Sequence, residues 1–105
     1  MITIENDQLL KKIEAGDEDA IIEGLLSGSA SVRISAIIYA MCYELKSKPV
    51  VIQLEKLSND ESTILGNRVS SFANAALDRF KILHYDGDDD LTIRLIKAQM
   101  SELIK

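Results

Sequence analysis

Apolar residues occur along this chain in blocks with helical spacing, and short polar turns separate the blocks. The most apolar block covers residues 31–45, in which only Arg33 and Glu44 are charged. Its apolar side chains would fall on nearly all sides of a helix, and such a helix has to be covered by neighbours on several sides. We therefore expect residues 31–45 to form the buried central helix of the fold.

Two helices are predicted before this central helix. The first begins after a short extended lead, with Asn6 as its cap, and ends at Gly16. The second begins with Asp17, Glu18 and Asp19, because carboxylates are favoured in the cap and first turn by the positive end of the helix dipole. Both helices carry apolar residues at helical spacing.

The connections predict how these helices pair. Residues 27–31 form a turn of small residues that is too short for a flexible linker, so the second and central helices should pack as an antiparallel hairpin. Gly24, inside the second helix, should weaken it by about 1 kcal/mol relative to alanine. A fourth helix is predicted from Pro49 to Leu57, because proline fits the first turn of a helix.

Two further helices are predicted after the polar turn at residues 58–62. A long amphipathic helix runs from Ile64 to Phe80, with Gly66 as a possible irregularity near its start. A last helix over residues 91–104 follows an acidic turn. No strand pair is indicated, so the chain is expected to be all-α, with about six helices in a single domain over residues 1–105.

Composition and charge narrow the class of protein. With 105 residues, 47% of them hydrophobic and 28% charged, the chain has the composition of a single soluble domain. It has neither the ~20-residue apolar run of a membrane helix nor a basic, apolar start typical of a signal peptide, so we expect a cytoplasmic protein and no membrane contact. The net charge of −5 disfavours direct nucleic-acid binding and suits a basic partner.

A weak internal repeat is present. The first unit consists of a helix, a serine turn and a second helix that carries Val32, Arg33 and Ala36. A similar unit follows, with Arg68 placed 35 residues after Arg33, but Asn67 precedes this arginine where the first unit has a valine. The Val-Arg pair followed by a small residue resembles the second helix of HEAT or armadillo-like repeats. That resemblance implies antiparallel hairpins stacked as a short right-handed superhelix, and by analogy a binding scaffold. An irregular helical bundle is the alternative.

Motifs for catalysis or cofactor binding are weak. Cys42 is the single cysteine and lies in the most apolar block, where an inert buried thiol is expected. His84 is the single histidine and has no recognisable nucleophile motif near it. The acidic stretch 86–90 does not match a calcium loop, since Leu91 stands where glycine is required. We predict no enzyme activity, no cofactor and no metal site.

The candidate partner-binding residues are acidic. In an up-down stack the N-termini of the second, fourth and sixth helices share one edge, and the carboxylates that begin the second and sixth helices would crowd there. These residues are Asp17, Glu18, Asp19, Asp86, Asp88, Asp89 and Asp90. They could hold a basic partner, because complementary charge speeds association and orients it; helix capping and a solvated face are the plainer explanation.

Tyr39 and Tyr43 lie four residues apart on the central helix, and so on one of its faces. They are either core filling or contributors to a partner surface.

These features favour a domain that binds another protein. Its small size, acidity and lack of catalytic motifs resemble bacterial immunity proteins, which neutralise a cognate toxin, frequently a basic nuclease. In that case the carboxylates would mimic phosphate. The alternatives are a HEAT-like adaptor that binds its partner through an apolar surface, and a small enzyme without a recognisable motif. The sequence leaves the oligomeric state open.

Overall fold

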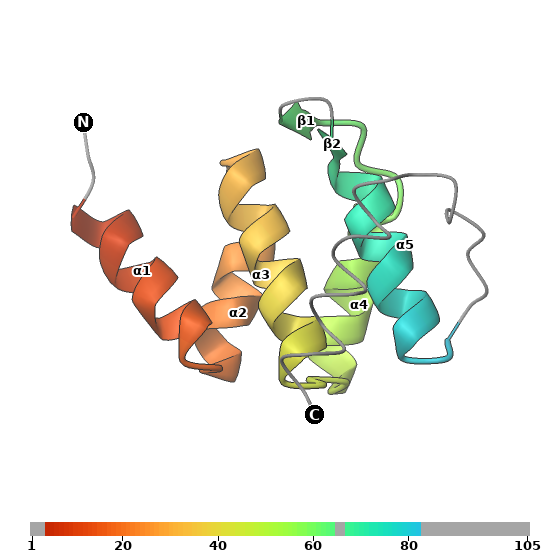
Figure 1. The fold of residues 1–105 in the computed structure, drawn as a ribbon, viewed down its shortest axis with the longest axis horizontal. Coiled ribbons are helices and arrows are strands. Elements are labelled where there is room, and N and C mark those ends of the chain that lie inside the picture. Colours follow the sequence, from red (N-terminus) through yellow and green to blue (C-terminus); the bar gives the residue numbers. More distant parts are fainter. Residues whose placement is uncertain (1–3, 65–66, 83–105) are drawn as a thin grey trace.

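The computed structural model describes residues 4–64 and 67–82. They form five α-helices and a very short β-hairpin (Figure 1). The elements are α1 (Ile4–Glu14), α2 (Glu18–Leu25), α3 (Ala30–Cys42), α4 (Lys48–Leu57), β1 (Thr63–Ile64), β2 (Asn67–Arg68) and α5 (Val69–Arg79). The fold is all-α, as predicted. The sixth predicted helix lies outside the described residues.

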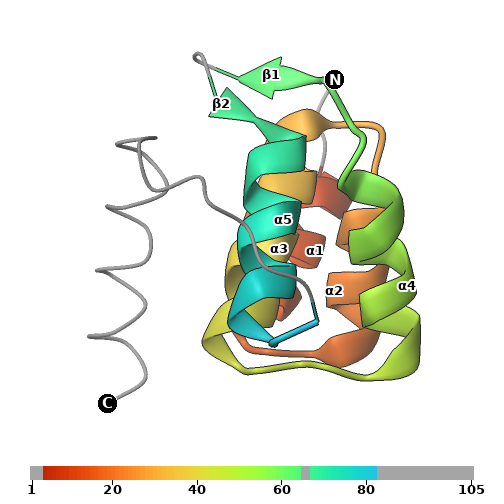
Figure 2. The same ribbon diagram turned by 90° about the vertical axis from the view of Figure 1, so that its right-hand side faces the viewer.

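The helices are arranged as two hairpins in two layers. α2 and α3 form one hairpin and α4 and α5 the other, and Figure 2 shows α2 beside α4 in one layer and α3 beside α5 in the other. α1 packs on both α2 and α3 at one end of the stack. The predicted hairpin of the second and central helices is therefore confirmed.

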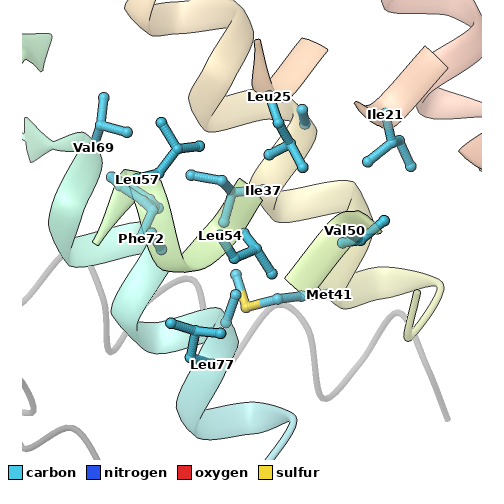
Figure 3. Close-up of a cluster of buried hydrophobic side chains, with 14 of the residues drawn as sticks. Ile21, Leu25, Ile37, Met41, Val50, Leu54, Leu57, Val69, Phe72 and Leu77 are labelled. Atoms are coloured by element: carbon cyan, nitrogen blue, oxygen red, sulfur yellow. The ribbon is translucent and has the colours of Figure 1, made fainter. Parts of the chain in front are cut away.

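One hydrophobic cluster lies between the two layers. Figure 3 shows side chains from α2, α3, α4 and α5 converging there, among them Ile21, Ile37, Leu54 and Leu77, each almost completely buried. α3 contributes to the cluster along its length and contacts α1, α2 and α5. Its predicted role as the central helix is confirmed. Its outward side chains are half-buried, so it is less completely enclosed than its sequence suggests.

The start of α5 corrects the sequence prediction. The long helix was expected from Ile64, but residues 63–64 and 67–68 form an antiparallel ladder and α5 begins at Val69. Two backbone hydrogen bonds across the connection between α4 and α5 explain this: the Val69 N–H donates to Ser62 O and the Ser70 N–H to Asp60 O, both at 2.9 Å. These acceptors satisfy the first N–H groups of the helix. Gly66 lies outside the described residues.

Some of the helix starts predicted from the sequence agree with the structure, and others do not. The Asp17 carboxylate accepts a hydrogen bond from the Ala20 N–H at 3.2 Å, which confirms it as the cap of α2. Pro49 lies in the first turn of α4, as predicted. The Asn6 cap is wrong, because α1 already begins at Ile4. The first N–H groups of a helix can also be satisfied by water, so a capping residue nearby does not dictate where the helix starts.

Left-handed residues end α1, α3 and α5. Gly16 (φ 83°), Glu44 (φ 50°) and Lys81 (φ 61°) each follow the last turn of a helix. After α3, the Leu45 N–H reaches back to Ala40 O and the Glu44 N–H to Met41 O, the bond pattern of a Schellman motif. The predicted stop at Gly16 is confirmed, whereas α3 ends at Cys42 rather than Leu45.

We expect Glu44→Gly to stabilise the protein by about 1 kcal/mol. Glycine adopts a left-handed conformation without a Cβ penalty, and the change removes a negative charge from the negative end of the α3 dipole. Urea denaturation followed by circular dichroism measures the effect. Glu44→Ala is the matched control, because it removes the charge but keeps the Cβ. Equal stabilities of the two variants would contradict this explanation.

Candidate functional site

The acidic start of α2 is exposed to solvent in part. Asp17 and Asp19 are exposed, whereas Glu18 is half-buried. Glu18 accepts a hydrogen bond from the Ser47 hydroxyl at 2.7 Å (Oε2 to Oγ). Ser47 is the cap residue of α4, yet its side chain makes this contact instead of bonding to its own helix.

The hydrogen bond between Ser47 and Glu18 brings the N-termini of α2 and α4 to the same edge. The shared edge predicted for these two helices is therefore confirmed. The edge is not purely acidic, since Lys46 and Lys48, both exposed, flank Ser47 in the chain. Of the candidate carboxylates that the structure describes, Asp17 and Asp19 are exposed and can reach a partner.

A groove of about 540 Å³ lies between α1 and α2. Both of the exposed aspartates line it, together with an exposed glutamate of α2 and a lysine of α1. The lining residues are Gln8, Leu9, Lys12, Asp17, Asp19, Ala20 and Glu23. Apolar side chains thus contribute to the groove alongside three carboxylates and one ammonium group, so it has a negative balance that suits a basic segment.

Sequence reasoning missed Glu23 as a site residue. Glu23 stands four residues after Asp19, and Lys12 four residues after Gln8, so each pair shares one face of its helix. That spacing was a usable signal. What the sequence could not show is that these two faces meet, because that depends on how α1 packs against α2.

The other half of the predicted acidic edge lies outside the described residues. This applies to Asp86, Asp88, Asp89 and Asp90, and also to His84. Their meeting with Asp17 and Asp19 stays a prediction.

Tyr43 makes a structural contact at the end of α3. Its hydroxyl donates to Glu14 O at 2.8 Å, and its ring lies so close to Gly16 that a Cβ there would come within 2.8 Å of it. Tyr43 therefore holds the turn between α1 and α2, while 47% of its surface stays accessible. Tyr39 is half-buried, and burial, followed by the charge of Glu14, raises the pKa of its hydroxyl. Tyr43 is the more accessible of the two for a partner.

Arg33 joins the two hairpins. Its Nη1 donates to Ser27 O at 2.7 Å, within its own hairpin, and its Nε lies 3.0 Å from Oδ2 of Asp60, in the turn between α4 and β1. The N–H at Nε is not aligned with the carboxylate for a hydrogen bond, so this contact acts as an ion pair. Partial burial opposes ionisation of Asp60, but hydrogen bonding to Ser62 and the Arg33 charge outweigh it and lower the pKa of this carboxyl.

Cys42 is half-buried on α3. Burial raises the pKa of its thiol, and the nearby charge of Arg79 only partly opposes this shift. A raised pKa reduces the thiolate fraction at neutral pH, as expected for a structural cysteine.

Within the described ranges, no three His, Cys, Asp or Glu side chains are grouped so that they could hold a metal ion. None of the helices in the same ranges is long and apolar enough to span a bilayer. The groove between α1 and α2 brings exposed carboxylates and apolar side chains together, and it is our candidate site.

Comparison with protein-family models, with curated proteins and with solved structures finds no significant match to this chain. Its function has to be argued from the groove and the surfaces around it.

Proposed function

We propose that this chain is a non-enzymatic domain that binds another protein, and that it acts as an immunity protein for a bacterial toxin. The toxin would be basic, with a nuclease as the favoured class. The observation that carries this proposal is the groove between α1 and α2, where Asp17, Asp19 and Glu23 are exposed and Lys12 is the one cation among the described residues of the lining.

The mechanism follows from charge and shape. A nuclease that acts on a phosphate backbone needs clustered Lys and Arg side chains, and exposed carboxylates can occupy them in place of phosphates. The groove also includes Leu9, which is half-buried and can pack against the aliphatic part of a basic side chain. Long-range attraction would speed the encounter, and bound inhibitor would then exclude the nucleic acid.

We expect the double variant Asp19→Lys, Glu23→Lys to reduce the association rate with the toxin by about 100-fold at low salt, since opposite charges steer the encounter. Asp17 is left unchanged because it caps α2. The binding partner for this test is the protein encoded beside this gene in the genome, because an immunity gene normally adjoins its toxin gene. Surface plasmon resonance at about 50 and 500 mM salt measures the rates, because higher salt screens exposed charges.

Glu55→Lys is the matched control, because Glu55 is an exposed carboxylate on α4 and does not line the groove. It should change the rate less than about threefold, since its charge lies away from the proposed contact. Unchanged association of the double variant, or equal loss in the control, would contradict binding through this groove.

A HEAT-like adaptor is the alternative proposal. It is supported by the packing of α2 against α4 and of α3 against α5, which is the pairing that a stack of two repeated hairpins would produce. Leu26, at the end of α2, and Ile52, on α4, are exposed on the layer formed by these two helices and could take part in apolar docking. Such an adaptor should bind its partner with little dependence on salt, whereas binding through the groove should weaken steeply as salt increases.

A further inference from the structure

The two walls of the groove between α1 and α2 differ in chemistry. On the α2 wall, the exposed polar side chains of the described lining are Asp17, Asp19 and Glu23, which at neutral pH can only accept hydrogen bonds. The α1 wall presents the Lys12 ammonium, which can only donate, and the Gln8 amide, which can do both; these two side chains are also exposed. The groove therefore has a negative side and a positive side.

The opposite charges do not cancel inside the groove. In the part of the chain that the structure describes, the Lys12 ammonium forms no ion pair with Asp17, Asp19 or Glu23. Both sides of the groove therefore keep their charge for a partner, and a partner that brings a cation and an anion together can pair with both.

The backbone joins the two walls at one end of the groove. The Asp17 N–H donates to Lys12 O and the Gly16 N–H to Ile13 O, both at 3.0 Å, which is the bond pattern of a Schellman motif. The Asp17 carboxylate then caps α2. Lys12 and Asp17, which carry opposite charges, are thus held next to each other by the turn between the helices, so the separation of charge is part of the fold.

We propose that the groove binds a segment of the partner protein that carries an arginine beside a carboxylate; this inference rests on the function proposed above. The arginine pairs with Asp19 and Glu23, which stand four residues apart and share one face of α2. A guanidinium has five donors in a fixed fork, so it can serve two carboxylates at once. The partner's carboxylate pairs with Lys12 on the other wall.

The size of the groove agrees with an occupant larger than one side chain. Its volume of about 540 Å³ lies within the range of about 300–1,000 Å³ that is typical of sites for whole ligands. A segment with two neighbouring charged side chains can therefore enter it.

A nuclease active site offers this combination of charges. Such sites place cations that hold the phosphate beside carboxylates that bind metal ions or act as a general base. A purely acidic inhibitor would bring its carboxylates against those of the enzyme, and like charges in contact reduce affinity. Because Lys12 offers a cation to such a carboxylate, the groove suits an active site better than a uniformly basic surface.

The test is the sign of one substitution, measured by isothermal titration calorimetry with the protein encoded beside this gene. Lys12→Met keeps an unbranched side chain but removes the charge, so it makes the groove more negative. It should nevertheless increase Kd by at least about tenfold, because the partner's carboxylate loses its opposite charge. Lys12→Arg, which keeps the charge, should stay within about threefold of the wild type.

Lys11→Met is the matched control. Lys11 is exposed on α1 and precedes Lys12 in the chain, but it does not line the groove. Its loss changes the net charge of the protein by the same amount, and it should alter Kd less than about threefold.

A double-mutant cycle identifies the partner's carboxylate. Each exposed Asp or Glu of the partner is replaced by its amide, and one of these variants should be coupled to Lys12→Met by at least about threefold in Kd, because paired charges are not additive. Additivity with every one of them would overturn the pairing.

The outcomes separate this inference from the proposed function. Tighter or unchanged binding of Lys12→Met, or an equal loss in Lys11→Met, would overturn the arginine–carboxylate partner, while loss of binding in Asp19→Lys, Glu23→Lys would still support an acidic groove that holds a basic protein. Undiminished binding of that double variant would overturn both.

Discussion

Gly24→Val should destabilise the protein by about 3 kcal/mol, because overpacking of a close contact forces the backbone to move. Gly24 lies in α2, and its Cα faces side chains of both α1 and α3. A Cβ at this position would meet the Ile13 Cδ1 at 2.7 Å and the Ala36 Cβ at 2.9 Å. The end of Ile13 can rotate, but the Cβ of Ala36 is attached directly to the backbone of α3, so the two helices would have to separate.

Gly24→Ala should cost less, since the gain of about 1 kcal/mol in helix propensity offsets part of the overpacking. The sequence alone predicts that this change is stabilising, and the structure predicts the opposite sign. Urea denaturation of both variants decides between the two.

Gly28→Ala is the matched control, because nothing lies within 4 Å of a Cβ built there. It should change the free energy of unfolding by less than about 0.5 kcal/mol. A stabilising Gly24→Ala would show that α1, α2 and α3 are packed less closely than described.

Arg33→Met should destabilise the protein by about 2 kcal/mol, because it leaves the partly buried carboxylate of Asp60 without its opposite charge. The side chains of Arg33 and Asp60 are 13% and 17% exposed. The substitution also removes the hydrogen bond from Arg33 to Ser27 O. Both contacts through which Arg33 connects its own hairpin to the turn after α4 are then lost. Asp60→Asn and the double variant complete a cycle that isolates the ion pair.

The pH dependence gives a second measurement of the same link. The pKa of Asp60 is lowered in the folded protein, so its ionised form contributes stability that is fully present above its unfolded pKa of about 4. This contribution is lost as pH falls through the lower, folded-state pKa. Denaturation of the wild type and Asp60→Asn should therefore differ most near neutral pH and converge in strong acid.

A stability difference between the wild type and Asp60→Asn that stays constant from neutral to strongly acidic pH would contradict a stabilising charge on Asp60. The double-mutant cycle of Arg33→Met and Asp60→Asn has its own contradicting outcome. If Arg33→Met costs the same in the wild type as in the Asp60→Asn variant, then Arg33 stabilises the fold through Ser27 alone.

The sequence predicted only part of the acidic site. The positions of Asp17 and Asp19 follow from local capping rules, and both were predicted as candidate binding residues. The groove itself, and Glu23 within it, depend on the packing of α1 against α2. No local pattern determines that packing, since the helix faces that could meet are far more numerous than those that do.

The sequence by itself determined the features that depend on a few neighbouring residues. The helical spacing of apolar residues predicted the all-α class, Asp17 and Pro49 marked two helix starts, and Gly16 marked a helix end. These rest on backbone geometry and nearby hydrogen bonds.

Only the tertiary structure decided the rest. The start of α5 at Val69 depends on acceptors at Asp60 and Ser62, and the sign of Gly24→Ala depends on Ala36 in another helix. Both require contacts between segments whose separation is set by the packing of whole helices. The first contacts form across the connection between α4 and α5, and the second forms between the two helices of the α2–α3 hairpin. Neither follows from the propensity of a single segment, because local propensity is weaker than the energy of packing.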